Sequence, residues 1–202
     1  MKKILFILFI APLAFACNNS SSDSVEKADS TNNVKADSSS TSTSTTDTSS
    51  NKMTGSMPVD KSTANFMVKV ADVGMTEVKL GQMAQDKGMN QGVKDFGAMM
   101  VRDHTNAGDE LKKLAGNKNV TLPAMIGADH QKKIDDLAKK SGKDFDKAYI
   151  SAMVSGHEAT VDDFKKASGD TKDPDVKTWI DRTLPTLQMH LDSAKAIQKR
   201  IK

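Results

Sequence analysis

The sequence predicts an all-α protein whose folded part is a four-helix bundle, and two observations carry this prediction. From Thr63 onward, four long segments repeat apolar or small residues in steps of three and four, the spacing that places side chains on one face of a helix. Aromatic residues make up only 4% of the 202 residues, and the 12 methionines favour an aliphatic core, which suits packed helices better than a sheet. No stretch shows the strict alternation typical of a half-buried strand.

The first 16 residues have the three parts of a secretory signal peptide. Lys2 and Lys3 form a positive start, an apolar run extends from Ile4 to Leu13, and small residues end the segment at Ala16. The apolar run is too short to span a bilayer as a stable helix. We therefore expect residues 1–16 to direct export and to be removed.

The only cysteine, Cys17, follows the predicted cleavage point directly. This position is typical of a bacterial lipoprotein signal, in which the cysteine is lipid-modified and becomes the new N-terminus, although Ala14 stands where such signals usually carry Leu. The alternative is plain signal cleavage in front of a free cysteine. We expect lipidation at Cys17, which would hold the protein on a membrane of the bacterial cell envelope, at the outer membrane or facing the periplasm.

Residues 17–61 are dominated by Ser, Thr, Asn and Asp, and the stretch from Ser38 to Ser50 is almost pure Ser and Thr. This segment lacks the apolar side chains that offset the entropy of ordering a chain. We expect a disordered, lipid-anchored tether over residues 17–61, followed by a bundle domain over residues 62–202.

The first half of the bundle is predicted from its start and stop signals. An apolar helical face runs from about Thr63 to Lys87, and Gly88 supplies a C-terminal stop. Asn90 can cap a second helix, which continues to about Gly116.

The second half follows a long connection. Residues 117–127 are predicted as a loop, residues 129–140 as a short helix, and residues 144–168 as the third long helix. Asp173 followed by Pro174 is a strong start signal for the last helix, with a capping carboxylate before a proline at the first helical position. The middle connection, with its extra short helix, is long enough to cross the bundle.

Four polar residues interrupt the inward faces of the long helices, one on each: Glu77, His104, His157 and His190. Each lies near the middle of its helix, so the four are expected at a similar depth. Neutral imidazoles and a carboxylate are a good ligand set for one divalent transition-metal ion such as zinc, iron or copper. The alternative is a buried hydrogen-bond network in which Glu77 pairs with histidines.

Residues near these histidines are further candidates for the metal site. Asp103 and Glu158 are expected at the edges of the inward faces, where they could serve as further ligands or orient the ligands. Met100 and Met153 each precede a histidine by four residues, and thioethers would favour copper, although core packing explains the two methionines better. The fourth histidine, His130, is predicted to be an exposed surface residue.

Composition excludes or disfavours several classes of function. The net charge is +3 and no basic cluster is interleaved with aromatic residues, so nucleic-acid binding is not expected. A single cysteine allows no internal disulfide and no thiolate metal cluster. Because no nucleophile signature or glycine-rich phosphate loop is present, an enzyme is not favoured, and a redox or hydrolytic metalloenzyme is the least preferred alternative.

The folded part resembles a family of bacterial exported domains of unknown function that is grouped with the ferritin-like proteins. The resemblance covers about residues 62 to 200. It rests on GMTEVKLGQMA around Glu77, FGAMMVRDHT (96–105), FDKAYISAMVSGHEATVDDF (145–164) and LPTLQMHL (184–191). It implies a ferritin-like bundle and an exported location rather than a particular reaction.

The chain departs from the ligand pattern of ferritin-like di-iron proteins, which carry Glu-x-x-His on two helices. Val101 stands three residues before His104, and Leu187 three residues before His190. Glu77 is the only carboxylate on an inward face, whereas a bridged di-iron site needs several. A single divalent ion is therefore easier to accommodate.

Taken together, the sequence predicts a cell-envelope lipoprotein whose bundle binds a divalent metal ion for storage, buffering or stress protection. The alternative is a non-catalytic structural or protein-interaction module with a buried polar network. The protein partners are not indicated by the sequence.

Overall fold

The computed structural model describes residues 23–39 and 59–201, and the predicted signal peptide and Cys17 lie outside them. Within these ranges the chain forms helices and no strand, so the all-α class is confirmed. The helices are α1 (Ser24–Ser39), α2 (Lys61–Lys87), α3 (Gln91–Asn117), α4 (Ala128–Ala138), α5 (Gly142–Asp170) and α6 (Pro174–Arg200). No helix in the described ranges has both the length and the apolar character needed to cross a bilayer.

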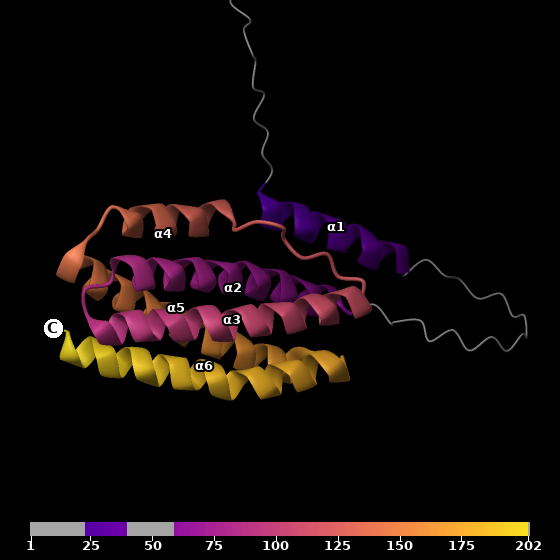
Figure 1. Ribbon diagram of the computed structural model, residues 1–202. Coiled ribbons are helices and arrows are strands. Elements are labelled where there is room, and N and C mark those ends of the chain that lie inside the picture. Colours follow the sequence, from indigo (N-terminus) through magenta and orange to yellow (C-terminus); the bar gives the residue numbers. More distant parts are fainter. Residues whose placement is uncertain (1–22, 40–58, 202) are drawn as a thin grey trace, which may run out of the picture.

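The four long helices form two antiparallel hairpins, α2–α3 and α5–α6, which pack against each other through α2 with α5 and α3 with α6. The connection between the hairpins runs back along the bundle and carries α4 beside α2, so that α3 and α5 point in the same direction (Figure 1). A bundle with one long crossover has the connectivity of ferritin-like folds.

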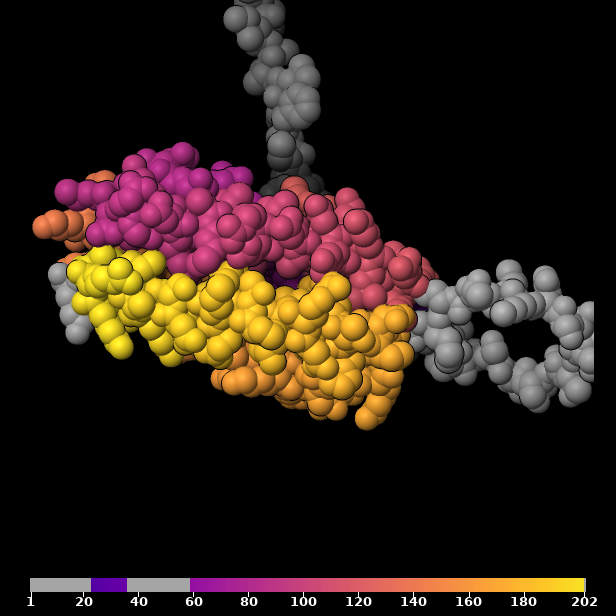
Figure 2. All heavy atoms as spheres, turned by 60° about the horizontal axis from the view of Figure 1, so that its bottom comes forward, coloured from indigo at the N-terminus to yellow at the C-terminus, as the bar shows by residue number. Residues whose placement is uncertain are grey.

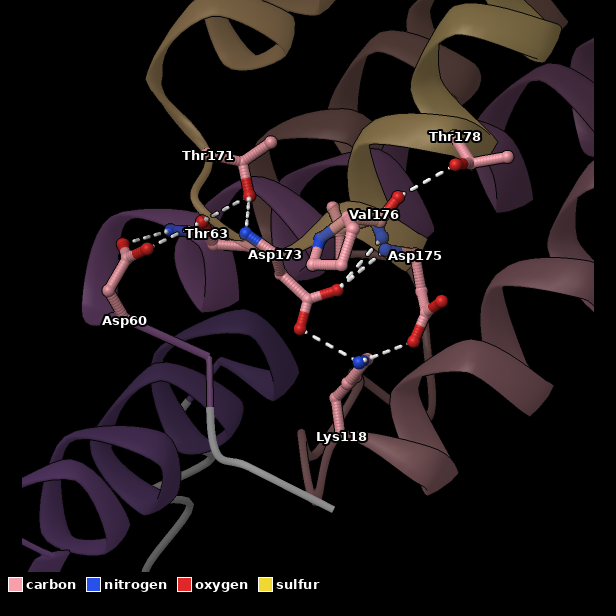
Figure 3. A network of polar contacts seen from close by, with 9 residues as sticks. Asp60, Thr63, Lys118, Thr171, Asp173, Asp175, Val176 and Thr178 are labelled. Atoms are coloured by element: carbon pink, nitrogen blue, oxygen red, sulfur yellow. Dashed lines mark hydrogen bonds and ion pairs between the residues drawn. The ribbon is translucent and has the colours of Figure 1, made fainter.

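The helix starts follow the capping signals of the sequence. The Asp60 side chain accepts a hydrogen bond from the Thr63 backbone N–H at 2.9 Å, and Asn90 does the same for Gly92 at 2.8 Å. Asp173 accepts from the backbone of both residues that follow Pro174, each at 3.0 Å (Figure 3). These bonds satisfy backbone donors that have no partner within a helix.

Helices α2 and α3 approach closely where two glycines face each other. A Cβ added at Gly81 would lie 2.7 Å from the Gly97 carbonyl oxygen, and one at Gly97 would lie 2.7 Å from the Gly81 carbonyl oxygen. No side chain fits between the two backbones at this point. The close approach of α2 and α3 therefore requires glycine at both positions.

The prediction of disorder across residues 17–61 is wrong for residues 24–39, which form α1 and pack on α2. The Asn32 amide exchanges two hydrogen bonds with the backbone of Thr121, at 2.8 and 2.9 Å, and the Ser24 hydroxyl accepts from two backbone N–H groups further along the crossover. Composition analysis missed α1 because polar side chains that bond the crossover backbone, rather than a broad apolar face, hold it in place.

The apolar core falls into two clusters with a polar layer between them. One cluster contains Leu80, Val93, Phe96, Met100, Phe145, Tyr149, Ile150 and Met153. The other contains Met67, Leu111, Val161, Phe164, Val176, Trp179, Ile180 and Leu187. In α3, α5 and α6, the residues between the two clusters include one buried histidine each.

Candidate metal centre

Three histidines from three different helices meet at the centre of the bundle. The ring centroid of His104 lies 5.7 Å from that of His157 and 5.4 Å from that of His190, and the last two are 5.4 Å apart. One ring nitrogen of each lies within 4.8 Å of the others. The residues are only 8%, 1% and 1% exposed, respectively. We call these three residues the histidine trio.

The orientation of His157 is set by its own helix. Its Nδ1–H donates to the Met153 carbonyl oxygen at 2.9 Å, one turn earlier in α5. This bond assigns the proton to Nδ1 and leaves a lone pair on Nε2. The Nε2 atom is buried and has no hydrogen-bond partner among the described residues.

The orientation of His190 is set across a helix interface. Its Nε2–H donates to Oδ2 of Asp103 at 2.9 Å, which joins α6 to α3, the two helices that lie side by side in Figure 2. Arg102 in turn holds Asp103 with hydrogen bonds of 2.7 and 3.1 Å. The lone pair of His190 is therefore on Nδ1, which is buried and unpaired in the described part of the chain. Asp103 therefore fixes the orientation of the His190 ring, and not that of its sequence neighbour His104.

Burial keeps the trio uncharged. It lowers the pKa of His104 to about 3, with the two neighbouring imidazoles adding to the effect, and it lowers the pKa of His157 to about 4. The pKa of His190 is also lowered by burial, against the opposing influence of Asp103. The imidazoles are therefore neutral at pH 7, which is the form that binds metals.

Glu77 lies beside the trio but outside its ligand group. Its Oε1 is 3.9 Å from Nδ1 of His157, too far for a hydrogen bond, and that nitrogen already donates to a carbonyl. Its Oε2 is buried without a partner among the described residues. Burial raises the pKa of Glu77 to about 8, so the carboxyl group is mostly protonated at pH 7. The geometry does not support the alternative of a Glu77–histidine hydrogen-bond network.

The remaining predicted site residues fall outside this cluster. The prediction that Glu158 belongs to the site is wrong, because its side chain is half exposed and forms a surface ion pair with Lys195 at 2.7 Å. Met100 and Met153 are 0% and 1% exposed and belong to one of the apolar clusters. Met153 contributes to the site through its backbone carbonyl, which sequence analysis could not reveal.

His130 is also not the exposed residue that was predicted. It is partly buried, and its Nδ1 lies 2.6 Å from Oδ2 of Asp72 in α2, whose Oδ1 accepts from the Gly127 backbone N–H at 2.7 Å. Asp72 thus fixes the start of α4 against α2. Sequence analysis missed this contact because it depends on how the crossover returns along the bundle.

A groove of about 250 Å³ lies elsewhere, between the start of α2 and the end of α5. Phe66, Lys69 and Lys166 are among the residues that line it, and no member of the trio does. The histidine trio therefore lies inside the bundle and is separate from this surface groove.

Comparison with known proteins identifies the family. The family model described as "Domain of unknown function (DUF4142)" matches residues 48–197, so the chain belongs to this family. The prediction of a domain family without an assigned function is thereby confirmed. No curated protein shows a significant match to the sequence.

Solved structures share the fold at low sequence identity. A DUF305 fragment from Deinococcus radiodurans matches with a TM-score of 0.63 and 10% identity, over 71% of this chain and 99% of that one. CopM in its Cu(II)-bound form matches with a TM-score of 0.60 and 18% identity, over 69% and 97% of the two chains. CopM in its Cu(I)-bound form gives 0.59 and 17%, over 68% and 96%. These similarities establish a common helical bundle.

Proposed function

We propose that the bundle binds one transition-metal ion through His104, His157 and His190. The observation that carries this proposal is the set of three buried ring nitrogens that face one region of the core without hydrogen-bond partners among the described residues. A buried polar atom without a partner costs about 1–3 kcal/mol, so three together need a compensating ligand.

The donor set fits a metal ion in type and approximate spacing. Three nitrogens that each bind one ion at about 2.0–2.1 Å lie about 3.4 Å from one another. The nitrogens of the trio lie within 4.8 Å of one another, so side-chain movements of about 1 Å would bring all three to binding distance. The hydrogen bonds that His157 donates to Met153 and His190 donates to Asp103 hold these two rings in the tautomers that such binding requires.

We further propose that the protein is an exported, lipid-anchored envelope protein that stores or buffers metal, or protects against metal stress. The signal-like segment ahead of Cys17 supports the location. The copper-bound forms of CopM, a protein with the same type of bundle, support metal handling.

The test is the metal content of the tagless chain from residue 17 onward, carrying Cys17→Ser and purified without chelators, after incubation with zinc, iron or copper salts. We expect one bound ion per chain. His104→Ala and His190→Ala should lose it, whereas His130→Ala, which removes the histidine outside the trio, should retain it. A chain that stays folded and binds none of these metals contradicts the proposal.

A further inference from the structure

The ligand group that the structure assembles carries no charge of its own. It consists of three imidazoles, and no carboxylate oxygen belongs to it. Oε1 of Glu77 lies 3.9 Å from Nδ1 of His157, which is the nitrogen that donates to a backbone carbonyl and not the unpaired one. A metal ion at the trio would therefore meet three neutral nitrogens.

The nearest fixed negative charge on the other side is balanced. Asp103 binds His190, and the Arg102 guanidinium contacts both carboxylate oxygens of Asp103. The positive charge of Arg102 offsets the carboxylate as seen from the bundle interior. The surroundings of the trio thus offer little compensation for a high positive charge.

This charge distribution penalises divalent ions more than monovalent ions. The cost of moving an ion from water into a protein interior grows with the square of its charge, so a divalent ion pays about four times the penalty of a monovalent ion of the same size. Anionic ligands normally offset that penalty, and among the described residues no carboxylate oxygen belongs to the group of three nitrogens. Hard ions such as sodium prefer oxygen ligands, whereas copper accepts imidazole nitrogen and is also available as a monovalent ion.

The number of ligands also favours a monovalent ion over zinc. Zinc in proteins takes four ligands, one of which is a water or substrate molecule in open sites, whereas the trio supplies three and is almost completely buried. Zinc and Cu(I) both have a filled d shell, but Cu(I) is stable with three ligands and needs no added water molecule.

We infer that the histidine trio is a cuprous site, which selects Cu(I) over zinc and Cu(II) because three neutral imidazoles surround the ion in a buried position. This inference rests on the proposed function and specifies its ligand.

The experiment is an anaerobic competition titration of the Cys17→Ser chain from residue 17 onward, with Cu(I) against bicinchoninate and with zinc against a chromophoric chelator. We expect one Cu(I) per chain, with an affinity at least roughly 100-fold above that for zinc. His104→Ala should weaken Cu(I) binding by roughly 100-fold or more, because it removes one of three ligands. Glu77→Gln, a matched change of a buried neighbour outside the ligand group, should change it by less than roughly threefold.

X-ray absorption of the copper-loaded wild-type chain gives a readout that does not depend on whether variants fold. We expect a first shell of three nitrogens with the scattering pattern of imidazole. A fourth ligand, zinc binding tighter than Cu(I), or a Glu77→Gln loss as large as that of His104→Ala would overturn the cuprous assignment while leaving a metal site in place. Failure to bind either metal would overturn the proposed function as well.

Discussion

Two polar clusters, one at an end of the bundle and one at its centre, differ in how their polar atoms are paired. At one end, Lys118 lies between Asp173 and Asp175, with ion-pair distances of 2.8 and 2.7 Å, and Asp173 also caps α6 (Figure 3). The hydroxyls of Thr63 and Thr171 continue the network at 3.1 Å. We call this the Lys118 network, and its charged groups are all paired.

At the centre, the histidine trio has one unpaired nitrogen on each ring within the described residues. The two clusters therefore differ both in charge and in how completely their polar atoms are paired. The Lys118 network is held together by its own ion pairs and hydrogen bonds, whereas each ring of the trio keeps a buried nitrogen without a partner among the described residues. The comparison predicts that changes to the two clusters will have opposite effects on stability.

The largest expected effect is the stabilisation of the trio by its ligand. A ligand present at 1,000 times its dissociation constant stabilises the folded state by about 4 kcal/mol. Thermal unfolding of the tagless Cys17→Ser chain with and without Cu(I) should show this increase, and a chelator should reverse it. If Cu(I) does not raise the melting temperature of the wild-type chain, the unpaired nitrogens of the trio do not form a binding site for it.

The second effect is the loss of a paired charge from the Lys118 network. Lys118→Met removes the partner of the largely buried Asp173, so we expect a loss of about 2 kcal/mol in the free energy of unfolding, measured by urea titration. Lys166→Met is the matched control, because Lys166 pairs with Asp170 on the exposed surface, and it should cost less than about 0.5 kcal/mol.

The third effect is a pH dependence caused by Glu77 in the metal-free protein. Its pKa is raised from 4.5 to about 8 by burial, so between these values the folded chain holds a proton that the unfolded chain has released. The contribution of Glu77 to stability therefore falls as pH rises through this window, by at most about 1.4 kcal/mol per pH unit for one proton.

The histidines make stability change with pH in the opposite sense, around and below about pH 6.5, the pKa of an unfolded histidine. Their lowered pKa values mean that acid protonates the unfolded chain first, which destabilises the fold as pH falls. Chemical unfolding of the metal-free chain between about pH 7.5 and 8, where the unfolded histidines are mostly neutral, reports mainly on Glu77, and Glu77→Gln should remove the downward slope. An unchanged slope in that variant would show that another group is responsible.

The smallest effect has the opposite sign to that of Lys118→Met. His104→Leu replaces a buried imidazole with an apolar side chain of similar size, and it removes an unpaired nitrogen, so the metal-free protein should gain about 1 kcal/mol in unfolding free energy. The same variant should lose metal binding. A loss of several kcal/mol would instead indicate that the trio is a structural network.

The sequence predicted the helices well because their determinants are local. Asn90 and Asp173 cap the helices that they were expected to cap, and α2 ends in front of Gly88. The depth of the trio followed from counting residues along helices of similar length. By contrast, α1 was missed because its contacts with the crossover join residues about 90 positions apart.

Within the candidate site, periodicity identified the inward faces but not the partners. His104, His157 and His190 converge as their spacing indicated. Glu77 shares their depth, yet the turn of α2 about its own axis leaves its carboxyl group 3.9 Å from the nearest histidine nitrogen. Asp103 and Glu158 each adjoin a histidine in sequence, but one points into the α3–α6 interface and the other pairs with Lys195 at the surface.

The sequence by itself thus determined that this chain forms a helical bundle with polar residues at mid-height, because helix periodicity, caps and breaks act over a few residues. Only the tertiary structure decided which of those residues face one another and which nitrogen of each histidine is free. Those properties depend on how each helix is rotated against its neighbours and on hydrogen bonds between distant segments, such as that of His190 with Asp103.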